Sequence, residues 1–178
     1  YWTGTMEVGS SVDVGLYDSE YYTMSDFSSW GVPGNLTLKP EITAPGGEIY
    51  SVDGSVSSGD AYKNLSGTSM ASPQVAGMAA VVAQYIRENG LEAKTGLTAR
   101  QLAQSLLMST AQPLFEEASG GNYYSLMNQG AGLARVDLAS QADSFIRVDG
   151  QDDYKVKAEL GDDPAKTGVY TFDFDITN

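Results

Sequence analysis

A stretch of small and apolar residues from 67 to 90 constrains the fold of this chain most strongly. Its apolar side chains recur at helical spacing, which predicts a long helix that begins at or just after Ser69. The recurring positions are Val75, Met78, Ala79, Val82, Tyr85 and Ile86. Pro73 is expected in the first turn, where its missing N–H costs nothing, and Gly90 is expected to end the helix. Small residues along this helix allow it to lie close against neighbouring elements.

Other segments predict a mixture of helices and short strands. A second helix is expected from Thr98, because Thr98 and Gln101 form a capping-box pattern. A short buried strand is expected around Ile42, before a tight turn. A glycine-rich link at residues 130–132 is expected to lead into a short helix near residues 136–142.

The last part of the chain has a different composition. Acidic loops and strand patterns begin after Asp143, and we expect a domain boundary there. Residues 169–177 alternate apolar and polar side chains, which predicts a strand that would have no partner to pair with. Because the chain begins at Tyr1 and stops directly after this strand, we interpret it as an excised or processed piece of a longer protein.

The composition limits the chemistry that the chain can perform. Its 178 residues include 23 acidic and 10 basic side chains, for a net charge of -13. This charge disfavours nucleic acid as a partner, and no apolar run is long enough to predict a membrane span in this segment. The chain has no cysteine and therefore no disulfide or thiolate chemistry. It also has no histidine, so an enzyme made from this chain alone must work without that general base.

The reactive chemistry is concentrated in residues 67–77, Gly-Thr-Ser-Met-Ala-Ser-Pro-Gln-Val-Ala-Gly. Ser69 is expected at a helix start, near unpaired N–H donors and the positive end of the helix dipole. Its own N–H could donate to an oxyanion formed by attack on a carbonyl, and Gly67 allows close approach of a substrate. The nucleophile elbow of α/β-hydrolases is disfavoured, because residue 71 is alanine and no strand leads cleanly into the turn. An ordinary N-cap is the alternative interpretation of Gly67-Thr-Ser69.

This motif closely resembles the serine motif of the subtilisin-like proteases, the subtilases of peptidase family S8. Residues 27–31, 39–51 and 130–139 are similar to further segments of that family, in the same order. Four motifs in order are far more specific than one, and together they cover about 120 residues. The resemblance implies an α/β fold, namely the C-terminal part of a subtilisin-like parallel-sheet three-layer domain.

The sequence of residues 39–51 is most similar to that of large cell-envelope subtilases of the lactocepin and C5a-peptidase type. That similarity implies that residues 1–22 are the exit from an inserted protease-associated-like domain. Residues 23–143 would be the serine-bearing C-terminal part of the catalytic domain, and residues 144–178 the beginning of a fibronectin-III-like β-sandwich. It also implies an extracellular location, at the bacterial cell surface or cell wall.

The resemblance assigns roles to few residues. Ser69 corresponds to the catalytic nucleophile, and Thr68 and Gly67 correspond to oxyanion-binding or substrate-binding positions. Met70 corresponds to an oxidation-sensitive methionine next to the nucleophile. Gln74 occupies a place where many relatives have a histidine that is not the catalytic one. The family's aspartate, histidine and oxyanion-hole asparagine lie upstream, and no position of this chain matches them.

The resemblance therefore implies the serine-bearing part of an endopeptidase, which hydrolyses protein or peptide substrates through an acyl-enzyme on Ser69. This part alone is expected to be inactive, because it lacks the base. The alternative is a non-catalytic adhesion or binding protein on a degenerate subtilase scaffold. A homo-oligomer formed through uncovered strand edges also stays open.

No cofactor and no metal site are expected in this chain. Acidic residues cluster at 149–153 and at 162–163, but they lack the spacing and central glycine of an EF-type calcium loop. They are interpreted as solvated loops, and calcium binding by the parent protein stays open.

Overall fold

The structure is a computed structural model, and it describes residues 22–31, 34, 37–56, 61–151 and 155–178. The predicted exit from an inserted domain, residues 1–22, therefore lies outside the described residues except for Tyr22.

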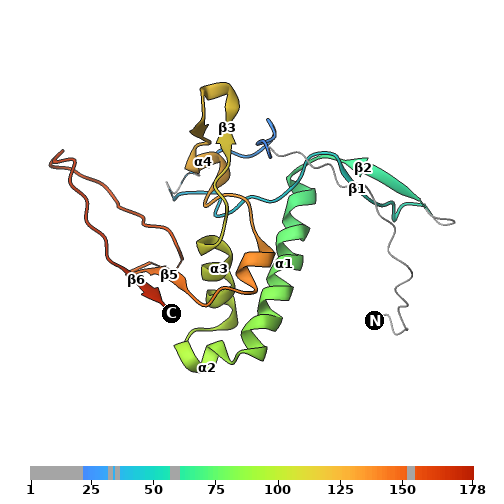
Figure 1. The fold of residues 1–178 in the computed structure, drawn as a ribbon. Helices are drawn as coiled ribbons and strands as arrows, with labels where there is room; N and C mark the ends of the chain where they lie inside the picture. Colours follow the sequence, from blue (N-terminus) through green and yellow to red (C-terminus); the bar gives the residue numbers. More distant parts are fainter. Residues whose placement is uncertain (1–21, 32–33, 35–36, 57–60, 152–154) are drawn as a thin grey trace.

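Helices and short strands alternate along the described part of the chain (Figure 1). In chain order they are β1 (Ile49–Val52), β2 (Tyr62–Leu65), α1 (Thr68–Glu88), α2 (Leu91–Thr95), α3 (Ala99–Ser109), β3 (Phe115–Glu116), the 3-10 helix η1 (Glu117–Ser119), β4 (Asn122–Tyr123), α4 (Leu126–Gln129), α5 (Val136–Ala139), β5 (Phe145–Val148) and β6 (Phe174–Thr177). This mixed content agrees with the predicted α/β class.

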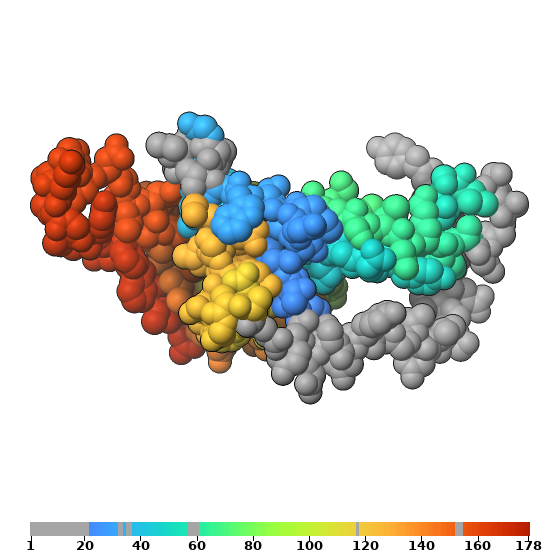
Figure 2. Space-filling view, turned by 90° about the horizontal axis from the view of Figure 1, so that it is seen from above, coloured from blue at the N-terminus to red at the C-terminus, as the bar shows by residue number. Residues whose placement is uncertain are grey.

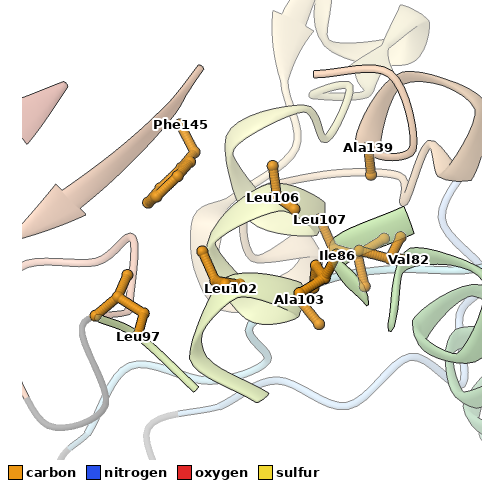
Figure 3. Packing of buried hydrophobic residues seen from close by; sticks show 9 residues of the cluster. All are labelled: Val82, Ile86, Leu97, Leu102, Ala103, Leu106, Leu107, Ala139 and Phe145. Carbon is orange, nitrogen blue, oxygen red and sulfur yellow. The ribbon is translucent and has the colours of Figure 1, made fainter. Parts of the chain in front are cut away.

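The core lies where α1 packs against α3 (Figure 3). The buried cluster consists of Val82, Ile86, Leu97, Leu102, Ala103, Leu106, Leu107, Ala139 and Phe145. Val82 and Ile86 are fully buried on the predicted apolar side of α1, which confirms its helical periodicity. The helix ends at Glu88, and Gly90 follows in the left-handed conformation at φ 60°, as the predicted stop requires.

The position of Pro73 differs from the prediction. The helix begins at Thr68, so Pro73 is its sixth residue and lies in the second turn instead of the first. Pro73 therefore lacks the N–H that would pair with the carbonyl of Ser69. The start of α1 is displaced because Gly67 donates its N–H to the distant carbonyl of Gly46, at 2.8 Å, which a local pattern cannot reveal.

The predicted capping box at the start of α3 is confirmed. The Thr98 hydroxyl accepts a hydrogen bond from the Gln101 N–H at 3.3 Å. In return, Gln101 Oε1 accepts from the Thr98 N–H at 3.0 Å. Both N–H groups would otherwise lack partners at the helix start, so this exchange favours α3 beginning at Ala99.

All three sheets among the described residues are two-stranded and antiparallel, pairing β1 with β2, β3 with β4, and β5 with β6. The strand predicted around Ile42 is reduced to a single parallel bridge between Thr43 and Leu133. The three-layer parallel sheet implied by the resemblance is thus not formed by the described residues alone. Parallel strands need neighbours joined by crossover connections, and this bridge is one contact of that kind.

The glycine-rich link lies between two other segments and bonds to both. Thr43 donates its N–H to Gly132 at 2.9 Å, while Leu133 and Gln112 exchange hydrogen bonds at 2.8 and 2.9 Å. A Cβ on Gly130 would lie 2.5 Å from the Glu41 carbonyl oxygen, and one on Gly132 would lie 2.4 Å from the Gln112 oxygen. Both glycines also have positive φ, so this close approach requires glycine. The predicted short helix after the link is α5.

The last strand has a partner, contrary to the expectation from the sequence. Strand β6 pairs antiparallel with β5 in the register Phe145↔Thr177 to Val148↔Phe174. The expectation was wrong because Phe-Ile-Arg-Val of β5 does not alternate strictly and is separated from β6 by about 25 residues. Phe145 belongs to the core cluster, so β5 connects this C-terminal pair to α3.

A cluster of charged side chains links residues 155–159 to residues 38–41. Glu41 forms ion pairs with Lys39 and Lys155, the latter at 3.1 Å, and Lys157 donates to the Leu38 carbonyl at 2.8 Å. Burial raises the pKa of Glu41, but the hydrogen bonds from Lys39 and Lys155 outweigh it, so the pKa lies below its usual value. These contacts hold residues 155–159 beside residues 38–41. Figure 2 shows the C-terminal residues, in orange and red, at one end of the elongated molecule and the β1–β2 hairpin at the other.

Candidate active site

The candidate nucleophile lies directly after the β1–β2 hairpin. Strand β2 ends at Leu65, and α1 begins at Thr68 after a turn at Gly67. A strand therefore does lead into this turn, contrary to the prediction, because strand pairing with β1 defines it more clearly than its own sequence does. Residue 71 is still alanine, so the Gly-x-Ser-x-Gly pattern is not restored.

The first turn of α1 presents backbone donors close to Ser69. Gly67 donates its N–H to Gly46, and Met70 donates its N–H to the Gly67 carbonyl at 3.0 Å. Thr68 and Ser69 lie between Gly67 and Met70 in the chain. The N–H groups of the first helical residues have no carbonyl partner within the helix. N–H groups at such a position can stabilise an oxyanion.

The alternative interpretation as an ordinary hydroxyl N-cap is wrong. The N-cap residue is Gly67, which has no side chain, and both hydroxyl residues lie inside the helix. The Thr68 and Ser69 side chains are exposed. Ser69 is thus placed at the surface by the helix start without serving as its cap.

A pocket of about 390 Å³ opens beside Ser69, between the hairpin and the start of α1. Its lining residues are Ile49, Ser51, Val52, Lys63, Leu65, Ser69, Met70, Pro73 and Gln74. The register of the hairpin accounts for four of these residues, because Ile49 pairs with Leu65 and Ser51 with Lys63, and alternate residues of a strand point to the same face. Val52, at the end of β1, belongs to the other set. Tyr50 and Tyr62 belong to the alternate set and stack on each other, with ring centroids 5.4 Å apart.

The loop of Pro45 and Gly46 lies tightly against the serine turn. A Cβ on Gly46 would be 2.8 Å from the Gly67 carbonyl oxygen and 3.4 Å from the Ala71 Cβ. Gln74 donates its side-chain N–H to the Pro45 carbonyl at 2.8 Å. Two of the segments that resemble the family, 39–51 and 67–77, therefore pack against each other.

One ion pair borders the pocket. Lys63 lies 2.8 Å from Asp53, and both the Ser55 hydroxyl and its backbone N–H donate to the same carboxylate oxygen. The hydrogen bonds from Lys63 and Ser55 lower the pKa of Asp53 to about 2. This carboxylate is therefore ionised throughout the neutral range, and it holds the lysine at the rim of the pocket.

The low pKa of Asp53 leads to a titration experiment. We expect its carboxyl carbon signal to titrate near pH 2 by NMR, and to move toward the usual value of about 3.9 in Lys63→Met. Because the folded-state pKa is lowered, the stability from this contact is present above pH about 4 and is lost as pH falls toward 2. The same midpoint in wild type and Lys63→Met would show that Lys63 does not cause the shift. Lys94→Met, on α2, serves as a charge-matched control.

Of the predicted site residues, the structure brings together Gly67, Thr68 and Ser69 at one helix start. It supplies no imidazole base, since the chain contains no histidine. Sequence reasoning missed the contributions of Gly46 and of the Gln74 amide. The Pro-Gly-Gly segment was the only available signal for the loop, and nothing local indicates its partner.

The acidic clusters do not assemble a recognisable metal site in the described part. No group of three or more acidic side chains that could hold a metal is found there, and Asp152 and Asp153 lie outside it. Asp163 accepts hydrogen bonds from Gly168 at 2.7 Å and from Thr167 at 3.2 Å, which organise its own loop. Among the described helices, none is both long and apolar enough to cross a membrane.

Comparison with known proteins places this chain in a class of serine proteases. The model of the subtilase family, Peptidase_S8, matches residues 2–140. The chain belongs to the subtilase family, which confirms the resemblance stated from its motifs.

Its relatives include bacterial proteinases that are much longer. The PIII-type proteinase of Lactococcus lactis subsp. cremoris (strain SK11) is 35% identical over 144 residues, covering 76% of this chain and 7% of that protein. The PII-type proteinase of Lacticaseibacillus paracasei matches with the same values. The C5a peptidase of Streptococcus pyogenes is 40% identical over 124 residues, covering 69% of this chain and 10% of that protein. The chain thus spans a tenth or less of the length of these curated relatives.

Proposed function

We propose that this chain is the serine-bearing part of an extracellular subtilisin-like endopeptidase. The observation that carries the proposal is the position of Ser69, exposed at the start of α1 beside a pocket. Membership of the subtilase family supports the same chemistry. Localisation at a bacterial cell surface follows from the resemblance to cell-envelope subtilases.

In the proposed reaction, Ser69 Oγ attacks the carbonyl carbon of the scissile peptide bond. A histidine from sequence outside this chain takes the hydroxyl proton, with an aspartate orienting the imidazole. The carbonyl oxygen becomes an oxyanion, which the Ser69 N–H and an asparagine from outside this chain stabilise. The histidine then gives its proton to the leaving amine, and water hydrolyses the resulting acyl-enzyme. Gly67 and Thr68 are proposed to bind the substrate and oxyanion beside the nucleophile.

The pocket beside Ser69 favours contact with an apolar side chain of the substrate. The apolar residues of its lining are Ile49, Val52, Leu65, Met70 and Pro73, and Lys63 supplies a cation. Burial of apolar surface contributes roughly 25 cal/mol per Å², so an aliphatic side chain gains from entering it. Protein or peptide chains are the proposed substrates.

The remaining architecture is proposed from the resemblance. Residues 1–22 would leave an inserted protease-associated-like domain, and residues 144–178 would begin a fibronectin-III-like β-sandwich. Segments upstream would complete the parallel three-layer sheet, and the parallel Thr43–Leu133 bridge would become part of it. Residues 23–143 would then form the part of the catalytic domain that contains the nucleophile.

Peptide hydrolysis by the full-length protein tests the proposal. We expect cleavage of a set of internally quenched peptides, and loss of that cleavage after treatment with a serine-directed inhibitor. A non-catalytic adhesion protein on the same scaffold would leave every peptide intact. Cleavage that persists after inhibition would equally contradict the assignment to a serine nucleophile.

A further inference from the structure

The side-chain amide of Gln74 connects α1 to the loop that packs against the serine turn. Its Nε2 donates to the Pro45 carbonyl oxygen at 2.8 Å. The next carbonyl along the loop, that of Gly46, accepts the Gly67 N–H, also at 2.8 Å. Two successive carbonyls thus hold α1 at two places, one before Ser69 in the sequence and one after it.

The loop that receives these bonds is itself anchored in the body of the fold. Thr43 donates its N–H to Gly132 and its hydroxyl to the Gln129 carbonyl, both at 2.9 Å. Gln129 is 1% exposed, and its side chain bonds to the backbone of Leu114 and Tyr124. The loop therefore connects the buried hydrogen bonds of Gln129 to the start of α1.

The start of α1 lacks two restraints that a helix can have. Gly67 has no side chain with which to cap the helix, and Pro73 has no N–H for the Ser69 carbonyl. Gln74 directly follows this proline in the chain. Its bond to Pro45 restrains the turn at the point where the helical hydrogen-bond ladder is interrupted.

We propose that Gln74 is a positioning residue, which sets the orientation of the Ser69 hydroxyl and N–H through the Pro45–Gly46 loop. The inference rests on the proposed function and adds to it that Gln74 acts on catalysis through the position of Ser69. Gln74 also lines the pocket, so a substrate-contact role is the competing explanation. The two roles differ in kinetics: lost contact with bound substrate raises KM, while a displaced nucleophile lowers kcat.

The test compares Gln74→Glu with Gln74→His in the full-length protein. Glutamate keeps the shape but cannot donate at neutral pH, whereas an imidazole N–H can donate to Pro45. We expect kcat to fall about tenfold in Gln74→Glu with KM within about twofold, and to stay within about threefold of wild type in Gln74→His. Gln84→Glu makes the same change farther along α1, where the side chain donates to Glu88 at 2.7 Å, and should leave kcat unchanged.

Hydrogen exchange on the same variants separates this inference from the proposed function. We expect the Gly67 amide, followed in a peptide covering residues 65–70, to exchange about tenfold faster in Gln74→Glu. Unchanged exchange, or a rise in KM with unchanged kcat, would overturn the positioning role. Faster exchange in a protein whose wild type cleaves no peptide would support the Gln74 restraint and contradict the peptidase assignment instead.

Discussion

Replacing Ser69 with alanine in the full-length protein is expected to reduce peptide hydrolysis by about 10⁶-fold in kcat, the loss typical when a triad nucleophile is removed. Ser69 is the residue of the proposed triad that this chain supplies, and it is exposed at the start of α1, where it lines the pocket. Substrate binding should change little, because the serine contributes one small side chain to the pocket lining. Steady-state kinetics of a quenched peptide, with binding to the inactive variant measured separately, checks both expectations.

The matched control is Ser72→Ala, an exposed serine on the same helix three residues later. It removes the same hydroxyl from α1 without touching the pocket, so kcat is expected to stay within about twofold of wild type. Equal activity in wild type and Ser69→Ala would contradict the nucleophile assignment. Equal loss in both variants would indicate damage to the helix instead of to the chemistry.

A second large effect is expected from Gly132→Ala, through stability. Gly132 has φ 119°, and an added Cβ would lie 2.4 Å from the Gln112 carbonyl oxygen. Positive φ costs about 1 kcal/mol for an L-residue, and overpacking a close backbone contact adds about 1–3 kcal/mol. The free energy of unfolding of the chain is expected to fall by about 3 kcal/mol, as measured by urea denaturation.

Gly120→Ala separates the two causes, because Gly120 has φ 78° but nothing within 4 Å of an added Cβ. It carries the conformational cost without the clash, so a loss of about 1 kcal/mol is expected. A loss for Gly132→Ala no larger than this would mean that the link does not require its close approach to Gln112. The stated packing between residues 112, 130–134 and 41–43 would then be wrong.

The helices were predictable because their signals are local. The apolar spacing of α1 and the Thr98–Gln101 capping box each lie within a few turns of sequence, and both are confirmed. The start of α1 was not predictable to the residue. The start depends on the hydrogen bond from Gly67 to Gly46, about 20 residues earlier in the chain. With the helix beginning at Thr68, Pro73 lies in the second turn and not, as was predicted, in the first.

The strands were harder to predict, since each depends on a partner elsewhere in the chain. Strand β2 is short and largely polar, and only its pairing with β1 defines it. The same holds for β6, whose partner β5 is shorter than the alternating pattern that predicted a strand. Pairing partners at long sequence separation leave no signal in either segment alone.

The candidate site was predictable in part for the same reason. The motif around Ser69 is contiguous, so its residue types identify the helix start and the expected nucleophile. The bond from Gln74 to Pro45 joins two segments 29 residues apart, and only the structure shows it. The absent base is a matter of composition, because no arrangement of this chain can supply a histidine.

The central claim is that Ser69 is a nucleophile activated by a histidine outside this chain. Mass spectrometry after treatment with a fluorophosphonate probe tests it directly, since the probe reacts with activated serines. The full-length protein is expected to carry one probe adduct, on the peptide containing Ser69, and the 178-residue chain alone is expected to carry none. An unlabelled Ser69 in the native full-length protein, or equal labelling of the isolated chain, would contradict this account.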